Sequence, residues 1–359
     1  MRGPTVTDRS TPALLLCGYY GENNLGDDAL LSVLVGDLPA GVQLWITAHD
    51  PTSVARIRSD ATPVDRRSLR AVLAAVGRVD AVVFGGGSLL QDSTSFRSLI
   101  YYLVLIAAAR LRGRSVLLWG QGLGPLHRPI SRWLVRMLLP LCSSASWRDP
   151  ASFALARRWA PKVPMELGPD PVWSMPAQPW VGGGAIVLSW RPTPLLDHQG
   201  WRRLLDAVSS LADQLDAPVC WMAFHQHQDA PLMAQLEQQG LLSGRLRERS
   251  TTVVPTELGM VFDLVKTARL VLPMRLHALV LARLAGCPMA ALSYDPKVEA
   301  AAAMSGIAWS RLDQLPATEV LLEQWLAAIE RGSTVLTTAE LRVDAAVHGR
   351  LLRQSLAQR

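Results

Sequence analysis

Short apolar runs recur along this chain, each ending in a glycine-rich or charged loop that leads into a helical pattern. The first run is Ala13–Cys17, which enters a loop from Gly18 to Asp28 before a helical pattern begins at Ala29. Further runs of the same kind are Gln43–Thr47, Asp80–Phe84, Ser115–Trp119 and Ser143–Trp147. Parallel strands need long crossovers, most often helices, so this alternation predicts an α/β fold with a doubly wound parallel sheet. The stretch Pro63–Val76 is expected to be helical.

The segment Pro169–Gly184 is dense in proline and glycine, which is typical of a linker. A second series of strands follows it: Ala185–Ser189, Val219–Phe224, Ala268–Leu272 and Met289–Ser293. Because 359 residues exceed one ordinary domain, we predict two Rossmann-like lobes whose parallel sheets face a cleft. The predicted boundaries are an N-terminal lobe at 1–170, a linker at 171–184, a C-terminal lobe at 185–330, and C-terminal helices at 331–359 that can cross back.

Composition narrows the class of protein. A hydrophobic fraction of 49% with 18% charged residues describes a well-packed chain and excludes a disordered one. The longest apolar stretch, Leu99–Ala109, is shorter than the ~20 residues of a bilayer span, so we expect a buried helix there. The four cysteines are far apart and form no CxxC pair, which favours reduced core thiols in a cytoplasmic protein.

The formal net charge of +6 favours anionic partners, either a phosphorylated substrate or an acidic membrane surface. The arginines are scattered without interleaved aromatic runs, so we predict no nucleic-acid partner. In Pro129–Cys142, Arg132 and Arg136 are one helical turn apart, with apolar residues between them. This pattern favours an amphipathic helix packed on the core, and peripheral contact with a membrane surface is the alternative.

Ligands of open α/β sheets bind beyond the carboxyl ends of the strands, where this chain places three glycine-rich loops: Gly18–Gly26, Gly85–Gly87 and Gly120–Gly124. Glycine lets backbone N–H groups approach an anion closely, although each loop alone also fits a tight turn. None has the spacing of a P-loop or of a dinucleotide fingerprint. Asp27 and Asp28 open a predicted helix and Asp92 ends a glycine loop; each fits either helix capping or contact with a substrate hydroxyl.

Cationic residues follow several predicted strands. Arg148, Arg191 and Arg275 can each present a planar fork to a phosphate or carboxylate, whereas a lone arginine there is usually a surface ion pair. His277 stands at the start of an apolar helix, which fits an acid/base group or a capping histidine. Lys297 is one of only three lysines in the chain. The segment Phe224–Asp229 holds two histidines and a carboxylate, a weak metal-binding signal without a third convincing ligand.

Taken together, seven motifs in order resemble the polysaccharide pyruvyl transferase family, and its cell-surface-anchoring branch in particular: GYYGENNLGDDAL, VVFGGGSLLQDSTS, GQGLGP, SWRDP, LSWRP, PMRLHALVLARLAG and SYDPKV. The resemblance implies a fold like the two-lobed GT-B glycosyltransferases. It also implies transfer of a pyruvyl unit from phosphoenolpyruvate onto two sugar hydroxyls as a cyclic ketal, with release of phosphate.

The resemblance implies that His277, Asp27 and Asp28 are catalytic. The implied phosphoenolpyruvate ligands are Arg148, Arg275 and Lys297, and the wider predicted substrate-binding set adds Arg191, Leu276, Tyr294, Gly86, Gly87, Asp92 and Gln121. The chain has Asp28 where family members commonly have glutamate, tryptophan at 147 and 190 where a small β-branched residue is common, and Pro273 where glycine is common. These departures spare the charged residues and bear on loop shape.

No metal or other cofactor is expected. The implied acceptor is an N-acetylmannosamine-type sugar, or another hexose, of a lipid-linked or polysaccharide precursor at the inner face of the plasma membrane. Two other interpretations stay open at this point. One is a GT-B glycosyltransferase that uses a nucleotide-sugar, and the other is a relative that binds a surface glycan without turnover.

Overall fold

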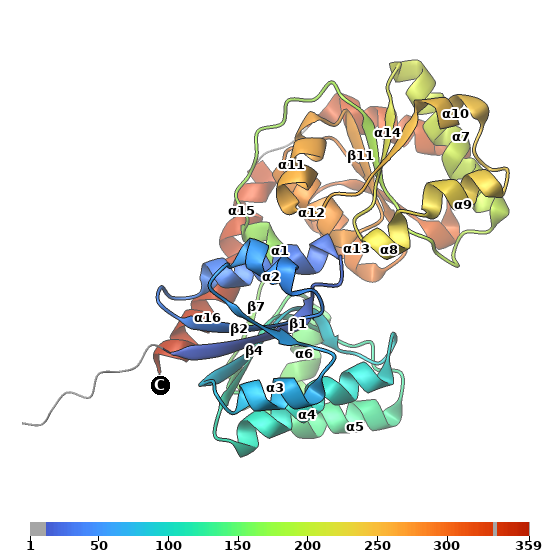
Figure 1. Cartoon of the computed structure of the whole chain (residues 1–359). Helices are drawn as coiled ribbons and strands as arrows, with labels where there is room; N and C mark the ends of the chain where they lie inside the picture. Colours follow the sequence, from blue (N-terminus) through green and yellow to red (C-terminus); the bar gives the residue numbers. More distant parts are fainter. Residues whose placement is uncertain (1–11, 333–335, 359) are drawn as a thin grey trace, which may run out of the picture. The chain divides into compact units, whose positions relative to one another are not determined.

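The computed structural model describes residues 12–332 and 336–358 and divides the chain into two compact units (Figure 1). Of the described residues, the first unit comprises those up to Glu22, Leu30–Pro171 and those from Ala346 onward, and the second comprises those of Asn23–Ala29 and Val172–Ala345. Each contains parallel β-sheet covered by helices, so the predicted α/β class is confirmed.

The first unit is built on a seven-stranded sheet with the order β3-β2-β1-β4-β5-β6-β7, in which every pairing is parallel. Its strands are β1 Ala13–Tyr20, β2 Gln43–Ala48, β3 Thr62–Asp65, β4 Ala81–Leu90, β5 Ser115–Leu123, β6 Ser144–Trp147 and β7 Met165–Leu167. The helical segments are the later part of α1 (Leu25–Asp37), α2 Pro51–Ile57, α3 Leu69–Val76, α4 Phe96–Leu111, α5 Pro129–Leu138, the 3-10 turn η1 Leu139–Leu141, α6 Pro150–Trp159 and α16 Val347–Ala357. Strands covered on both faces read as continuous apolar runs, and Leu14, Leu15 and Leu16 are fully buried.

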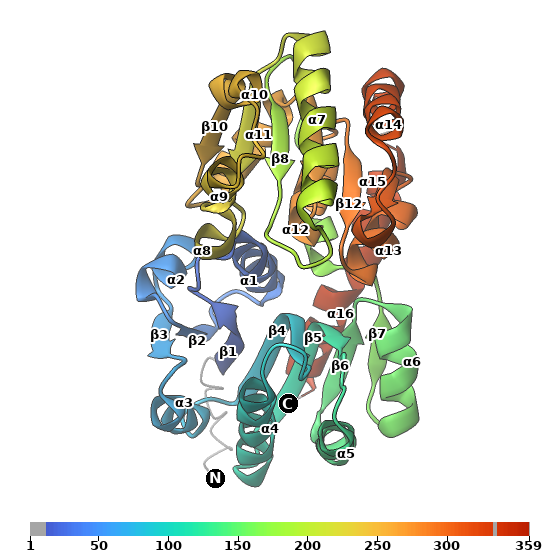
Figure 2. The same cartoon turned by 90° about the vertical axis from the view of Figure 1, so that its right-hand side faces the viewer.

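Helices cover both faces of this sheet (Figures 1 and 2). On one face α3, α4, α5 and α6 pack over a core that includes Val72, Leu99, Val135 and Ala156. On the other face α16 contacts β5, β6 and β7, and its Ser355 hydroxyl lies 2.7 Å from that of Ser144. The last helix of the chain therefore completes the first unit.

The second unit has a four-stranded parallel sheet of order β10-β9-β8-β11 and a parallel pair β12-β13, linked by a bridge between Val271 and Met289. Its strands are β8 Ile186–Ser189, β9 Val219–Met222, β10 Ser250–Val253, β11 Leu270–Pro273, β12 Ala290–Ser293 and β13 Ala308–Arg311. Its helical segments are η2 Pro171–Ser174 at its start, α7 His198–Leu215, α8 Gln226–Asp229, α9 Leu232–Gln238, α10 Gly244–Arg249, α11 Leu258–Thr267, α12 Leu276–Leu284, α13 Pro296–Met304, η3 Leu312–Gln314, α14 Thr318–Arg331 and α15 Leu336–Ala345.

Several details differ from the sequence-based expectation, and three of the strands, β7, β10 and β13, were not predicted. The predicted helix at Pro63–Val76 is wrong in its first part, because Thr62–Asp65 forms β3 and the helix begins only at Leu69, after Ser68 accepts the Ala71 N–H as its N-cap. A proline fits there because β3 is an edge strand. The strands predicted to end at Phe84 and Trp119 continue through their glycine loops to Leu90 and Leu123, with a register shift between Gly87 and Leu90.

Candidate active site

The carboxyl edge of the second unit's sheet gathers several of the predicted site residues. Pro273 at the end of β11 pairs with Ser189 at the end of β8, and Arg275 and Arg191 each follow two residues later. The two arginines therefore lie at the same edge of the sheet, beyond the carboxyl ends of two neighbouring parallel strands. His277 lies in the first turn of α12, and Leu276 is the first residue of that helix.

Arg275 is held by a buried ion pair with Asp229. Its Nε donates to one carboxylate oxygen of Asp229 at 3.2 Å and its Nη2 to the other, while Nη2 also donates to Gln228 at 3.0 Å. The Asp229 side chain is 1% exposed and that of Arg275 12%. The carboxylate also accepts the backbone N–H of His225 at 2.8 Å. Because a guanidinium has five N–H donors, this pairing fixes its position while using only part of its donor set.

His225 extends this group. Desolvation lowers the pKa of its imidazole, the positive charge of Arg275 adds to that effect, and Asp229 opposes it. The neutral form of the ring is therefore favoured. We refer to His225, Asp229, Arg275 and His277, together with Gly26, as the histidine–arginine cluster.

Gly26 joins the cluster although it follows β1 in the sequence. A β-carbon built on Gly26 would lie 2.3 Å from Nδ1 of His277, so a side chain there would displace the imidazole ring. The surrounding loop is fixed by backbone hydrogen bonds, from Leu25 to the Phe224 carbonyl at 3.2 Å and from Gln226 to the Asn23 carbonyl at 3.1 Å. Asn23 also approaches His227, with Nδ2 and Nε2 3.2 Å apart. The turn Asn23–Ala29, which contains Asp27 and Asp28 and is called the acidic turn below, therefore belongs to the second unit and lies next to His277.

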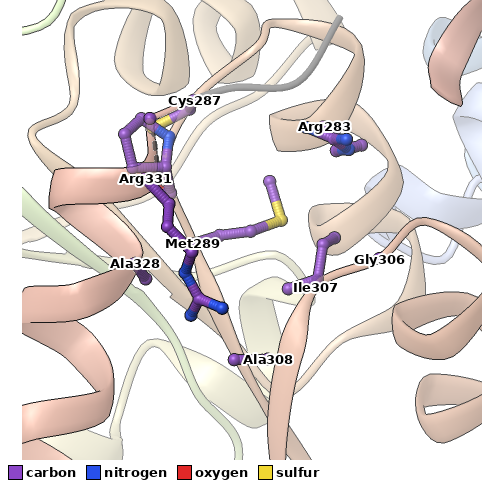
Figure 3. Close-up of a pocket in the computed structure, with 10 residues that line it drawn as sticks. Arg283, Cys287, Met289, Gly306, Ile307, Ala308, Ala328 and Arg331 are labelled. Carbon is purple, nitrogen blue, oxygen red and sulfur yellow. Dashed lines mark hydrogen bonds between the residues drawn. The ribbon is translucent and has the colours of Figure 1, made fainter. Parts of the chain in front are cut away.

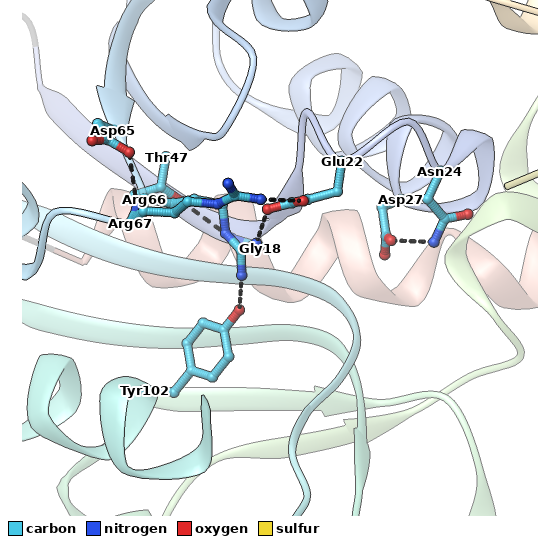
Figure 4. Close-up of polar contacts among 9 residues, drawn as sticks. All are labelled: Gly18, Glu22, Asn24, Asp27, Thr47, Asp65, Arg66, Arg67 and Tyr102. Atoms are coloured by element: carbon cyan, nitrogen blue, oxygen red, sulfur yellow. Dashed lines mark hydrogen bonds and ion pairs between the residues drawn. The ribbon is translucent and has the colours of Figure 1, made fainter. Parts of the chain in front are cut away.

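Asp27 and Asp28 lie in the first turn of α1. The Asn24 amide donates to the Asp27 carboxylate (Figure 4). The side-chain carbonyl oxygen of Asn24 accepts the Gly26 N–H at 3.2 Å. Glu22, the third acid of this loop, belongs to the first unit instead. Its carboxylate pairs with Arg66 and Arg67 (Figure 4). The Arg66 guanidinium carbon also lies 4.1 Å from the Tyr19 ring centroid.

Arg191 and Tyr294 form a second pair on the same edge. Arg191 Nη1 donates to the Tyr294 hydroxyl at 3.2 Å, and the guanidinium carbon is 4.7 Å from the ring centroid, a cation–π geometry. Tyr294 directly follows β12, and Lys297 lies in the first turn of α13, with its N–H capped by Asp295 at 2.9 Å. The edge of the second unit therefore combines three cationic side chains with His277.

Arg148 follows β6 in the first unit, where it is also paired. Its Nη1 donates to Asp170 at 2.8 Å and its Nη2 to Ser88 at 3.2 Å, with side-chain exposures of 7% for Arg148 and 6% for Asp170. Ser88 immediately follows Gly86 and Gly87, which have positive φ angles of 50° and 83°. A side chain at Gly86 would also meet Leu30 at 2.7 Å. The glycine loop thus has both a conformational and a packing requirement for glycine.

Gln121 and Asp92 are engaged inside the protein. The fully buried Gln121 amide donates to the carbonyls of Phe84 and Gly86 and accepts the Leu89 N–H, so it holds the glycine loop. Asp92 accepts the N–H groups of His127 at 2.7 Å and Arg128 at 2.9 Å. Burial alone would raise the pKa of Asp92, but the Ser131 hydroxyl and these two N–H groups outweigh it and lower the pKa to about 2. Both residues support the loops by these contacts, and a contact with substrate remains a prediction for each.

The sequence-based reasoning missed the carboxylates that pair with the arginines. Asp229 lies at the end of α8, in the segment with the weak metal-binding signal, and Asp170 follows β7, a strand that the apolar pattern does not predict. No sequence signal therefore marks their pairing with the arginines. Among the described residues, no cluster of three or more histidine, cysteine, aspartate or glutamate side chains has the geometry of a metal site.

A cavity of about 290 Å³ in the second unit lies at the other edge of its sheet (Figure 3). Its lining includes Met289 and Ala308, at the amino ends of β12 and β13, together with Arg283 and Arg331. Ligands of α/β sheets bind at the carboxyl ends of strands, so this cavity is separate from the candidate site. No helix within residues 12–332 and 336–358 is both long and apolar enough to cross a membrane.

Several solved structures have a similar fold. The Anabaena protein HepE, in complex with UDP and glucose, matches with a TM-score of 0.61 and 11% identity, covering 97% of this chain and 100% of that one. A putative UDP-N-acetylglucosamine 2-epimerase from Listeria monocytogenes gives 0.63 and 12%, covering 96% and 95%. The UDP-GlcNAc 2-epimerase from Neisseria meningitidis, bound to UDP-GlcNAc, gives 0.60 and 13%, covering 97% and 100%. At such identities the likeness shows the fold alone, which is the fold of GT-B glycosyltransferases and these epimerases.

A search of curated protein sequences gives no significant match. The family model of the polysaccharide pyruvyl transferases matches residues 24–296, about three quarters of the chain. That range contains the predicted catalytic and substrate-binding residues, from Asp27 to Tyr294, and ends one residue before Lys297. On this match the chain belongs to the polysaccharide pyruvyl transferase family.

Proposed function

We propose that this protein transfers a pyruvyl unit from phosphoenolpyruvate to two hydroxyl groups of one sugar residue, forming a cyclic ketal and releasing phosphate. Membership of the pyruvyl transferase family supports the transferase activity. The donor is supported by the cationic edge of the second unit, because phosphoenolpyruvate carries both a phosphate and a carboxylate. Arg275 and Lys297 are its proposed ligands there, and Arg148 is proposed as a further ligand from the first unit.

The observation that carries the proposal is the contact between Gly26 and the His277 ring. The acidic residues of the first turn of α1 therefore lie near a histidine in the first turn of α12, the helix that follows Arg275. An anion-binding arginine, an imidazole and a carboxylate are the groups that the reaction requires. Arg191, Leu276 and Tyr294 are proposed to complete the substrate-binding surface of this edge.

The chemistry needs one proton delivered and two removed. A proton adds to the methylene carbon of phosphoenolpyruvate while the oxygen of the first sugar hydroxyl bonds to the adjacent carbon and loses its proton. The bond from that carbon to the phosphate oxygen then breaks, phosphate leaves, and the second hydroxyl bonds to the same carbon and releases its proton. We assign His277 as one of the acid/base groups and Asp27 or Asp28 as the group that orients or deprotonates the sugar.

The proposed acceptor is an N-acetylmannosamine-type sugar of a cell-wall or surface polysaccharide precursor, as in the cell-surface-anchoring branch. A lipid-linked precursor would place the reaction at the cytoplasmic face of the membrane. This acceptor rests on the resemblance of the ordered set of seven motifs to the family.

The direct test is incubation of the protein with phosphoenolpyruvate and a panel of lipid-linked and synthetic sugar acceptors. Phosphate release would be measured together with the mass of the acceptor, and the expected product is the pyruvate ketal. Binding of a UDP-sugar without binding of phosphoenolpyruvate would instead support a glycosyltransferase. Glycan binding without any turnover would support a non-catalytic relative.

Variants separate the proposed roles. His277→Gln should lower turnover by about 100-fold or more, the usual contribution of a general acid or base, while phosphoenolpyruvate binding is retained. Arg275→Gln should weaken phosphoenolpyruvate binding. Near-normal turnover of His277→Gln would remove the role that we assign to this residue.

A further inference from the structure

Helix α5 exposes apolar side chains on the face that points to solvent. Its inner face is formed by Ser131 and Val135, which are buried against the core of the first unit. On its outer face Ile130, Trp133 and Met137 are 48%, 56% and 57% exposed, at the spacing of one helical stripe. Leu141, in the turn after the helix, is also exposed. The solvent face of a helix in a globular protein is normally polar. Packing against the core therefore does not explain why these exposed side chains are apolar.

Cationic side chains flank the apolar stripe. Arg128, Arg132 and Arg136 are one turn apart and exposed. The sequence around them is strongly basic, because residues 93–165 contain eleven lysines and arginines and a single acid, Asp149. The remainder of the chain has 25 basic and 29 acidic residues, so the positive charge of the protein is concentrated in this region.

The nearby acidic groups do not offset that charge at the surface. Asp149 is the N-cap of α6, where its carboxylate accepts the N–H and the hydroxyl of Ser152, both at 2.7 Å. Asp92, just before the region, is buried and accepts backbone N–H groups at the start of α5. Both carboxylates are therefore engaged by donors within the protein.

A cavity lies beside the stripe, between α5 and α6 (the two helices are seen in Figure 2). Its volume is about 390 Å³, and its lining combines the apolar Leu126, Leu155 and Trp159 with Arg132 and Arg158. Arg132 Nε donates to the Leu126 carbonyl at 2.8 Å, which holds the guanidinium at the cavity. An apolar lining with two guanidinium groups suits an amphiphile with an anionic headgroup.

We propose that the outer face of α5, defined by Ile130, Trp133, Met137, Arg128, Arg132 and Arg136, docks on an anionic membrane surface. The cations would lie among the lipid phosphates while the apolar stripe enters the boundary between headgroups and acyl chains, as in interfacial amphipathic helices. A nucleic acid would satisfy the arginines but offers no apolar phase to Ile130 and Met137. The inference is independent of the proposed transferase chemistry, since it concerns a surface of the first unit and needs no substrate.

The test is co-sedimentation of the full chain with vesicles, without phosphoenolpyruvate or acceptor. Vesicles of phosphatidylcholine mixed equally with phosphatidylglycerol should bind the protein, and vesicles of phosphatidylcholine alone should bind it at least tenfold more weakly. Binding to the anionic vesicles should fall as the salt concentration rises, because exposed charges are screened. Equal binding to both kinds of vesicle, or to neither, would overturn the proposal.

Paired variants test the two components of the surface. Trp133→Ser with Met137→Ser should weaken vesicle binding at least tenfold without changing the thermal unfolding curve, since both side chains are exposed. Arg132→Gln with Arg136→Gln should weaken binding and reduce its salt dependence. The matched control is Met304→Ser with Val320→Ser, two exposed apolar residues of the second unit, which should leave vesicle binding unchanged.

Two further outcomes would contradict the assignment. Unchanged vesicle binding of the Trp133→Ser, Met137→Ser variant would show that the apolar stripe does not enter the membrane. A dimer in solution that this variant dissociates, with no vesicle binding by the unchanged protein, would assign the stripe to contact between two copies of the chain.

Discussion

The present position of the His277 ring requires that residue 26 carry no side chain. Gly26→Ala would place a methyl group 2.3 Å from the present position of Nδ1, so the imidazole or the start of α1 must move. We expect this variant to stay folded and to lose at least tenfold in pyruvyl transfer, since a displacement of about 1 Å is enough to misalign an acid/base group. Phosphate release from phosphoenolpyruvate in the presence of acceptor is the measurement.

The same helix offers a matched control. Gly36 also lies in α1, and a β-carbon there has no heavy atom within 4 Å. Gly36→Ala should therefore leave turnover unchanged and stabilise the protein by about 0.5 kcal/mol or more, the usual effect of alanine in a helix. Equal turnover of the two variants would argue against a role for the Gly26–His277 contact.

Asp229 shows how much the site depends on a residue that need not touch substrate. Asp229→Asn would leave the Arg275 guanidinium without its buried negative partner, and removing one member of such a pair costs about 3 kcal/mol. We expect a lower free energy of unfolding in urea and weaker phosphoenolpyruvate binding. The control is Asp263→Asn, whose carboxylate pairs with Lys266 at the surface with 69% of its side chain exposed, and which should cost less than about 1 kcal/mol. A loss of equal size in both variants would contradict the prediction.

At the scale of the element, α16 is attached to the first unit through a buried histidine. His348 is fully buried, and its Nε2 donates to the Pro169 carbonyl at 2.7 Å. Desolvation lowers the pKa of this imidazole to about 4, and the hydrogen bond with Pro169 opposes that effect. The unfolded chain takes up the proton near pH 6.5, so between about pH 6.5 and pH 4 it is protonated while the folded form is not.

The sign of the pH dependence follows. The contribution of His348 to the free energy of unfolding is fully present above about pH 6.5. It falls as the pH is lowered, and about 2 kcal/mol is lost at pH 5. His348→Gln keeps an N–H donor for Pro169 and has no such proton, so the difference in unfolding free energy between pH 7 and pH 5 should shrink by about that amount. His225, whose pKa is also lowered, leaves a loss of the same sign. An unchanged difference in the variant would mean that His348 is not the acid-sensitive group.

Strands were predictable from the sequence where an apolar run was followed directly by residues typical of a loop. The core strands around Leu15, Val82 and Leu117 follow this pattern, because strands covered on both faces need continuous apolar sequence. The strand at Thr62–Asp65 was missed since its proline and charged neighbours are typical of helix starts and loops, and only its place at the sheet edge makes it a strand. The positions of the site residues at strand ends were also predictable. Their pairing with Asp229 and Asp170 was not, because it depends on side chains 46 and 22 residues away.

The acidic turn gives a second example. Asn23–Ala29 follows β1 of the first unit, yet its backbone hydrogen bonds go to Phe224 and Gln226 of the second. No periodicity in the sequence indicates that this turn belongs to the second unit, because a backbone hydrogen bond does not depend on residue type. The Gly26–His277 contact, which has the greatest bearing on the proposed mechanism, is therefore a result of the structure alone.

At the scale of the whole molecule, each unit has a hydrophobic core of its own. Leu105 is fully buried in the core of the first unit and Leu204 in that of the second, and the two side chains belong to separate clusters. A chain with two independent cores need not unfold in a single two-state transition. We expect differential scanning calorimetry to resolve two transitions, one for each unit.

Core substitutions can assign these transitions. Leu105→Ala and Leu204→Ala should each destabilise one unit by about 2–5 kcal/mol, the range for a buried leucine, and each should lower the temperature of one transition only. Phosphoenolpyruvate should then raise the transition that Leu204→Ala lowers, because the cluster around Arg275 and His277 belongs to the second unit, and a ligand stabilises the form that binds it. If both variants lowered a single transition equally, the units would unfold as one body. If phosphoenolpyruvate raised only the transition of the first unit, the donor site would have to be sought around Arg148 instead.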